Sequence, residues 1–184
     1  MAAESKACEL SWKARDFCLL GTDGRAYALA DVQGAKGTVV MFICNHCPYV
    51  KATIDRIARD MAELRPWGIG ALALMSNDVA AFPDDSLPNM KDFAARHGLG
   101  FPYVIEETQE IARGYDAQCT PDFFGFDAAL GLHYRGRLDA AGRNPAGPET
   151  RRELVEAMKG IAANGKGPKT QVPSIGCSIK WKGE

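Results

Sequence analysis

Two continuous apolar runs predict the central strands of a sheet. Residues 39–43 (VVMFI) and 69–75 (IGALALM) are apolar at nearly every position, without the alternation of a half-exposed strand. Such runs are typical of strands that are covered on both faces. Shorter apolar segments at 17–20, 26–28 and 101–105 predict further strands. We therefore expect a sheet whose middle is buried on both sides.

Two turns that contain glycine predict β-hairpins. The first, GTDG at residues 21–24, joins the two N-terminal strands. The second, at residues 127–131, joins strands at 123–126 and 132–134. Glycine readily adopts the positive φ that tight hairpin turns require, which supports both assignments.

Helical spacing follows the buried strands. Beyond Pro48, apolar residues recur every three or four positions as far as Leu64, with charged residues between them. Further helices are predicted at about 89–98, 109–115 and 149–163. Helices that alternate with buried strands predict an α/β three-layer sandwich, and the terminal hairpin makes its central sheet mixed.

Length and composition fit one ordinary globular domain. We predict a single domain over residues 1–184, with a core at about 12–163 and a tail at 164–184 that lacks periodicity. The net charge of −1 offers no basic face for nucleic acid, and the apolar runs are too short to cross a membrane. The first residues do not resemble a secretory signal, so we expect a cytoplasmic protein. The sequence leaves its oligomeric state open.

Two cysteines stand where the strand at 39–43 gives way to a helix. Cys44 and Cys47 enclose two residues in the sequence CNHC. The free N–H groups and the positive dipole end of a helix N-terminus favour a thiolate, so we expect the exposed cysteine to have a depressed pKa. Cys44 is then the expected nucleophile, and Cys47 resolves the mixed disulfide. His46 is expected to stabilise the reduced form and to make the disulfide more oxidising.

A lone CxxC motif has other interpretations. It is half of a zinc site where a second pair of ligands stands at metal spacing. The remaining candidate ligands are isolated in the sequence: Cys119, Cys177, His97 and His133. A scaffold that binds a metal or a partner without catalysis therefore stays open beside redox chemistry.

A proline beside another cysteine forms a second group, Cys119-Thr120-Pro121. Proline cannot donate to a sheet ladder, so Pro121 predicts either the entry to a strand or a cis peptide in a fixed turn. A cis-proline turn beside the thiols would keep a flat backbone edge for a bound peptide or thiol.

Three motifs together resemble one family: residues 44–51 (CNHCPYVK), 119–124 (CTPDFF) and 174–182 (SIGCSIKWK). They are similar to the peroxiredoxin-like, or redoxin, group of thioredoxin-fold proteins, in the alkyl hydroperoxide reductase/thiol-specific antioxidant superfamily. The similarity extends over about residues 12–182. It implies a thioredoxin fold with an N-terminal β-hairpin extension, a cis peptide before Pro121, and thiol-disulfide chemistry at the CxxC pair. It implies no defined substrate.

Three departures from related proteins bear on the chemistry. Peroxiredoxins carry a proline and a hydroxyl residue before the attacking cysteine. Val40 and Cys44 stand there in this chain, with Cys47 aligned to the attacking cysteine. A thiol-dependent peroxidase is therefore the alternative interpretation. Thioredoxins also place an acid in the preceding strand, where this chain has Thr38. The proton acceptor for Cys47 is thus not identified.

The prediction is a thiol-disulfide oxidoreductase that uses neither a metal nor an organic cofactor. Its partners are a thiol or disulfide substrate, either a protein or a small molecule, and a thiol reductant. The residues that tune the motif or shape the substrate edge are Asn45, His46, Pro48, Thr120 and Pro121.

The cysteines outside the motif have weaker assignments. Cys119 is predicted to be a buried small residue, with an alternative disulfide as the second interpretation. Cys177 is predicted to lie in a tail that packs through Ile179 and Trp181, with a resolving or regulatory thiol as the second interpretation. The cysteines treated as structural or incidental are Cys8 and Cys18.

Overall fold

The computed structural model describes residues 2–5 and 12–183 of the chain. Its elements follow in this order: β1 (Ala2–Glu4), β2 (Cys18–Gly21), β3 (Ala26–Ala28), α1 (Leu29–Val32), β4 (Gly37–Phe42), α2 (Pro48–Leu64), the 3₁₀ turn η1 (Arg65–Trp67), β5 (Ile69–Met75), the 3₁₀ turn η2 (Pro83–Asp85), α3 (Leu87–Arg96), β6 (Tyr103–Ile105), α4 (Glu110–Gly114), β7 (Cys119–Thr120), β8 (Asp122–Phe126), β9 (Leu132–Gly136), α5 (Glu153–Asn164) and β10 (Ile175–Ser178). Every helix within these residues is too short or too polar to cross a membrane.

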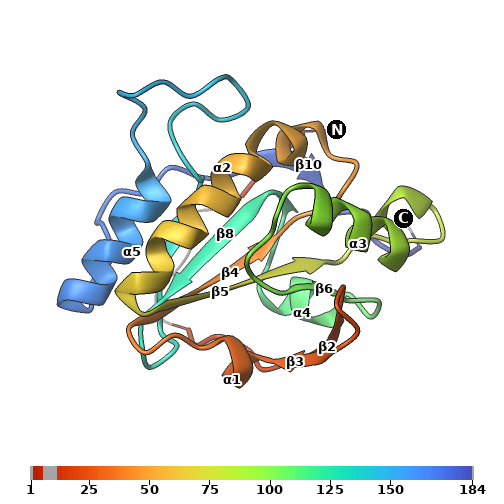
Figure 1. Ribbon diagram of the computed structural model, residues 1–184, viewed down its shortest axis with the longest axis horizontal. Helices are drawn as coiled ribbons and strands as arrows, with labels where there is room; N and C mark the ends of the chain where they lie inside the picture. Colours follow the sequence, from red (N-terminus) through yellow and green to blue (C-terminus); the bar gives the residue numbers. More distant parts are fainter. Residues whose placement is uncertain (1, 6–11, 184) are drawn as a thin grey trace.

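Seven strands form the central sheet, in the order β3-β2-β6-β5-β4-β8-β9 (Figure 1). The neighbours β4, β5 and β6 run parallel, and the other pairs run antiparallel, so the sheet is mixed as predicted. The apolar runs at 39–43 and 69–75 supply β4 and β5 in its middle. The two predicted hairpins, β2–β3 and β8–β9, form its edges.

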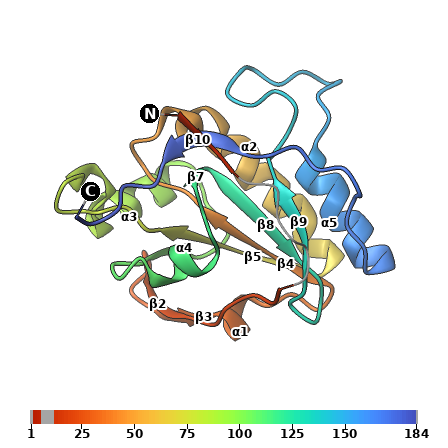
Figure 2. The same cartoon turned by 180° about the vertical axis from the view of Figure 1, so that it is seen from behind.

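Alternate residues of β4 point to opposite faces of the sheet, and both faces are covered. Val39 and Met41 join an apolar cluster with side chains of α2, α3 and α5. Val40 and Phe42 join a second cluster, which contains Tyr115 at the end of α4. Figure 1 shows α2 and α5 across one face, and Figure 2 shows α4 against the other. The mixed α/β architecture predicted from the sequence is therefore confirmed.

Helix α2 begins at the point where the chain leaves β4. Cys47 is its N-cap residue and Pro48 its first residue, where the missing N–H of proline costs no hydrogen bond. Val50, Ile54 and Ile57 are fully buried on the face of α2 that packs into the core. This packing fixes the helix start, and with it the turn that contains the CxxC motif.

The C-terminal segment contains a strand that the sequence pattern does not predict. β10 pairs antiparallel with β1 and with β7, and the three form a small second sheet. After β10, Ile179 is buried, and the guanidinium of Arg113 lies 4.3 Å from the centre of the Trp181 ring. The local pattern does not reveal β10 because pairing between distant segments stabilises it.

Candidate active site

The two cysteines of the motif lie against the turn at Thr120 and Pro121. Cys44 Sγ is 3.3 Å from Thr120 Oγ1, and Cys47 Sγ is 3.1 Å from Thr120 O. The peptide bond between Thr120 and Pro121 is cis, as the family resemblance implies. Both cysteines are free thiols with exposed fractions of 1% and 0%. The structure therefore brings the two sequence motifs together, but neither sulfur is open to solvent.

The negative charge of the reduced pair resides on Cys47. A hydrogen bond with the Cys44 thiol lowers the pKa of Cys47 to about 4, although burial opposes this shift. Smaller contributions to this lowered pKa come from the Cys177 thiol and the backbone amide of Val50. A protonated Cys47 donates to Thr120 O, whereas the thiolate accepts from its two thiol neighbours instead.

The pKa of Cys44 shifts in the opposite direction. The hydrogen bond with Cys47 raises it well above its ordinary value, and burial and the negative charge of Asp85 raise it further. At neutral pH the pair therefore holds one proton, and Cys44 carries it. The sequence pattern predicts Cys44 as the attacking sulfur. The contacts in the structure favour Cys47 as the thiolate.

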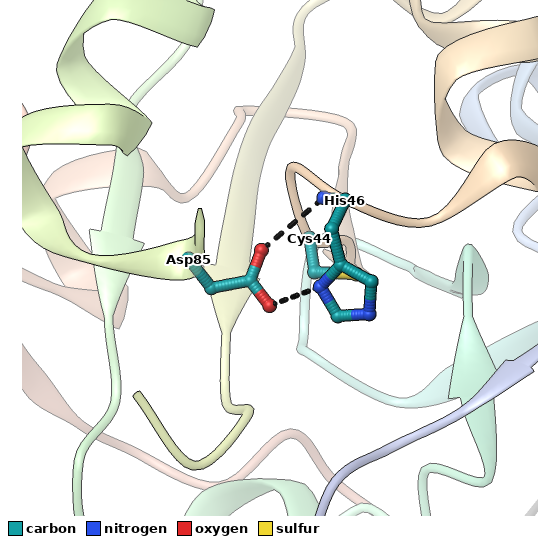
Figure 3. A group of neighbouring side chains, drawn as sticks. All are labelled: Cys44, His46 and Asp85. Atoms are coloured by element: carbon teal, nitrogen blue, oxygen red, sulfur yellow. Dashed lines mark hydrogen bonds and ion pairs between the residues drawn. The ribbon is translucent and has the colours of Figure 1, made fainter. Parts of the chain in front are cut away.

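The buried carboxylate of Asp85 lies beside the motif (Figure 3). It belongs to η2 and has no exposed surface. Its Oδ1 accepts from the backbone N–H groups of Asn45 and His46 at 2.8 and 3.3 Å. Its Oδ2 lies 2.7 Å from His46 Nδ1 and accepts from Asn77 Nδ2 at 2.8 Å. The sequence pattern predicts that His46 acts on a cysteine sulfur, but in the structure its ring nitrogen Nδ1 bonds to the Asp85 carboxylate.

Further contacts hold the two residues between the cysteines. Tyr103 OH donates to Asn45 Oδ1 at 3.0 Å, and Asn45 Nδ2 donates to Asp84 O at 2.9 Å. The His46 ring stacks on Phe82, with ring centroids 5.4 Å apart. These contacts fix the backbone of the turn, and thus the separation of the two sulfurs.

Sequence reasoning missed Asp85. The acid of thioredoxins corresponds in position to Thr38, whose hydroxyl here accepts from Gly34 N at 3.2 Å. Asp85 stands in a segment between Pro83 and Pro88 that reads as an exposed loop, without a hydrophobic period to indicate burial. An acid that follows a proline turn was the available signal, and it is too common on protein surfaces to identify a site.

Cys177 is the third sulfur at the site. β10 places this residue opposite Thr120, and its thiol forms a hydrogen bond with Cys47. Burial and this hydrogen bond raise the pKa of Cys177 to about 11. Cys177 therefore meets the thiolate as a protonated donor.

The remaining cysteines form no hydrogen bond with the motif in the described part of the chain. Cys119 is fully buried; its Sγ lies 3.6 Å from Pro121 O, and burial raises its pKa. Cys18 is exposed on β2. Cys8 lies outside the described residues.

Cys44, His46 and Asp85 form a candidate metal-ligand group among the described residues. One ligand atom from each lies within 4.8 Å of the other two. However, Asp85 already accepts four hydrogen bonds, and Cys44 retains the proton that a metal would have to displace. A structural zinc site also needs a fourth ligand. This group of side chains therefore fits a hydrogen-bond network better than a metal centre.

A polar cavity of about 460 Å³ borders the motif on the side of His46. Its lining combines the motif with side chains of both charges: Asn45, His46, Lys51, Asp84, Asp92 and Arg96. It offers room for a polar group beside Asn45 and His46, the two residues between the cysteines.

Comparison with known proteins assigns the chain to a family. Residues 11–137 match the AhpC/TSA family. The chain belongs to the AhpC/TSA family. This AhpC/TSA protein has no match among curated proteins.

Solved structures resemble this chain over most or all of its length. An uncharacterised conserved protein from Geobacillus kaustophilus is 43% identical, with a TM-score of 0.93 over 100% of this chain and 98% of that one. A hypothetical protein from Sinorhizobium meliloti 1021 is 33% identical, with a TM-score of 0.90 over 98% and 99%. A thioredoxin-family thiol:disulfide interchange protein from Chlorobium tepidum is 18% identical, with a TM-score of 0.63 over 85% and 99%. This last likeness shows the thioredoxin fold.

Proposed function

We propose that this AhpC/TSA protein is a thiol-disulfide oxidoreductase that works through Cys44 and Cys47. The observation that carries the proposal is their hydrogen bond, in which a buried thiol supports a thiolate of low pKa at the N-cap of α2. The thiolate is the form of cysteine that attacks a disulfide. Membership of the AhpC/TSA family supports redox chemistry at this position.

The proposed reaction consists of two exchanges. The Cys47 thiolate attacks one sulfur of a substrate disulfide, so a bond to Cys47 forms and the other substrate sulfur leaves as a thiolate. Cys44 then loses its proton and attacks Cys47 Sγ, which forms the Cys44–Cys47 disulfide and releases the second substrate thiolate. The substrate gains two electrons, the pair loses two, and a thiol donor returns them.

The order of these steps follows from the contacts of Cys44. Its pKa is raised chiefly by the hydrogen bond with Cys47. Once Cys47 is bonded to substrate, its thiolate charge is gone, so Cys44 becomes easier to deprotonate at the step that requires it. A carboxylate oxygen of Asp85 within 4.8 Å of Cys44 Sγ is the candidate acceptor for the proton, together with His46.

Equilibration with defined ratios of reduced and oxidised glutathione tests the proposal, with mass spectrometry of the trapped thiols. We expect a reversible two-electron couple between roughly −270 and −120 mV, the span of known dithiol oxidoreductases. Cys44→Ser/Cys177→Ser, which lacks both thiols that neighbour Cys47, should retain a mixed disulfide with glutathione on Cys47, whereas Cys47→Ser should retain none on Cys44. The absence of a Cys44–Cys47 disulfide at every ratio would contradict the proposal.

A thiol-dependent peroxidase is the second candidate function. The low pKa of Cys47 favours it, because this residue aligns with the attacking cysteine of peroxiredoxins. Peroxide would oxidise Cys47 to a sulfenic acid, and Cys44 would close the disulfide with release of water. Consumption of hydrogen peroxide faster than of a disulfide, by the same reduced protein, would favour this reaction over exchange.

A further inference from the structure

Strand β10 fills a backbone edge of the active site. It lies beside β7 (Figure 2) and runs antiparallel to it. In this pairing Cys177 is opposite Thr120, and Ser178 is opposite Cys119. Thr120 also supplies the carbonyl oxygen that lies 3.1 Å from Cys47 Sγ. An exposed strand edge binds extended peptides by adding a strand. Here the protein's own chain occupies that position.

The close approach of β10 requires glycine at position 176. A Cβ at Gly176 would lie 2.1 Å from Thr120 O, so a larger residue would displace the strand. The preceding residue, Ile175, is 53% exposed and tolerates other side chains. The pairing of β10 with β7 can therefore be weakened at one position and left intact at its neighbour.

Three sulfurs meet at Cys47. The thiols of Cys44 and Cys177 both form hydrogen bonds with Cys47, and Cys177 packs against the core cluster that contains the other two. A neighbouring thiol reacts at an effective concentration far above that of a thiol in solution. A disulfide at Cys47 can therefore close toward either neighbour.

The strands that pair with β10 lie outside the central sheet. β1 pairs with its other edge. After the strand, Lys180 N donates to Asn77 Oδ1 at 2.9 Å, and Lys180 O accepts from Asp78 N at 2.8 Å. Departure of β10 would break the small sheet and leave the seven-stranded sheet intact.

We propose that β10 is an internal substrate strand that presents Cys177 to Cys47 along the edge of β7, and that the external substrate is an extended, cysteine-bearing peptide segment that takes the same place. This inference rests on the proposed dithiol function and adds the class of substrate to it. Within the protein, Cys177 attacks Cys47 Sγ of the Cys44–Cys47 disulfide. The bond from Cys47 to Cys177 forms, the bond to Cys44 breaks, and the proton of Cys177 passes to Cys44. No electrons are gained or lost, so the step needs no oxidant.

Disulfide mapping of Cys44→Ser after treatment with oxidised glutathione tests the internal exchange. We expect a Cys47–Cys177 disulfide, and at least about tenfold less glutathione on Cys47 than in Cys44→Ser/Cys177→Ser. Adding Cys18→Ser, a change at an exposed cysteine, should leave the map unchanged. Persistent glutathione on Cys47 with Cys177 free would overturn the inference.

The paired variants Gly176→Val and Ile175→Val test the competition for the edge. The probes are oxidised glutathione and a short one-cysteine peptide activated as an aryl disulfide. Gly176→Val should react with the peptide at least about tenfold faster than the unmodified protein, because an internal strand no longer competes at high effective concentration. Ile175→Val should not change the rate.

Two outcomes of this second experiment would overturn the inference. One is an unchanged peptide rate in a Gly176→Val protein that still melts cooperatively. The other is an equal acceleration with glutathione, which would show that the edge does not select peptides. A normal Cys44–Cys47 couple in either case leaves the proposed function in place, so the two failures are distinguishable. If Gly176→Val does not fold, the disulfide mapping of Cys44→Ser still tests the internal exchange.

Discussion

The carboxylate of Asp85 and the imidazole of His46 are paired at 2.7 Å beside the Cys44–Cys47 turn. Asp85 is fully buried, whereas the His46 side chain is 21% exposed and lines the adjoining cavity. The pair thus connects an interior charge to the open side of the site. For Cys44 the result is a nearby negative charge that opposes loss of its proton.

Asp85→Asn should lower the pKa of Cys44 and destabilise the protein by about 1–3 kcal/mol. The pKa falls because the negative charge is removed, and stability falls because an amide NH₂ cannot accept the hydrogen bonds that the carboxylate accepts. Alkylation of Cys44 against pH and urea denaturation measure the two effects. The exposed neighbour offers a control, Asp84→Asn, which should change neither. An unchanged Cys44 pKa in Asp85→Asn would show that the charge does not act on this thiol.

The alkylation rate of reduced Cys47 should rise as pH passes through about 4 and then remain constant up to neutral pH. Cys44→Ala should shift this rise to higher pH, because the donated hydrogen bond is lost. Cys44→Ser retains a hydroxyl donor and should shift it less. Iodoacetamide labelling followed by mass spectrometry gives the profile. Equal profiles in the two variants would mean that the Cys44 hydrogen bond does not set the pKa.

Asp122→Asn should remove a decrease in stability between about pH 4 and pH 6. Burial raises the pKa of Asp122 to about 6, although Arg135 opposes the shift. In that interval the folded protein binds a proton that the unfolded chain has lost, so the free energy of unfolding falls as pH rises. The charged form costs roughly 2–3 kcal/mol by pH 7. Urea denaturation against pH measures this loss of stability. The oxidised protein is used because Cys47, which titrates near pH 4 when reduced, does not titrate in the disulfide. A constant difference between variant and parent over this interval would refute the assignment.

Tyr103→Phe should cost about 1 kcal/mol in the free energy of unfolding and increase the mobility of Asn45. Tyr103 is fully buried, and its hydroxyl donates to Asn45 Oδ1 at 3.0 Å. The substitution leaves this oxygen without its donor while the ring remains in place. Urea denaturation gives the energy, and the Cys44–Cys47 reduction potential reports on the turn. Stability equal to that of the parent would mean that water replaces the hydroxyl.

The parts of the fold that were predictable are those encoded by nearby residues. The runs at 39–43 and 69–75 became β4 and β5, and the amphipathic segment beyond Pro48 became α2. Because the CxxC motif stands between two such elements, its place at the end of a buried strand was predictable as well. The cis peptide before Pro121 followed from the family resemblance.

The parts that were not predictable depend on contacts between distant segments. Asp85 is buried because the turn at residues 44–47 folds over it, not because of its own neighbours in sequence. β10 is a strand because β1 and β7 pair with it. Both Cys44 and Cys177 lower the pKa of Cys47, and the second of these is 130 residues away (177 − 47). The pattern of neighbouring residues in the sequence does not reveal these contacts between distant segments.

The side chain of Asn77 joins two regions that have been described separately. Its NH₂ group donates to Asp85 Oδ2, and its oxygen accepts from Lys180 N just beyond β10. If β10 leaves the edge of β7, this amide loses the contact that orients it, and Asp85 loses a fixed donor at the same moment. The movement that exposes the sulfurs therefore also changes the surroundings of the Asp85 carboxylate beside Cys44. Because Asn77 bonds to both regions, displacement of β10 also changes the hydrogen bonding of Asp85 and, through its charge, the pKa of Cys44.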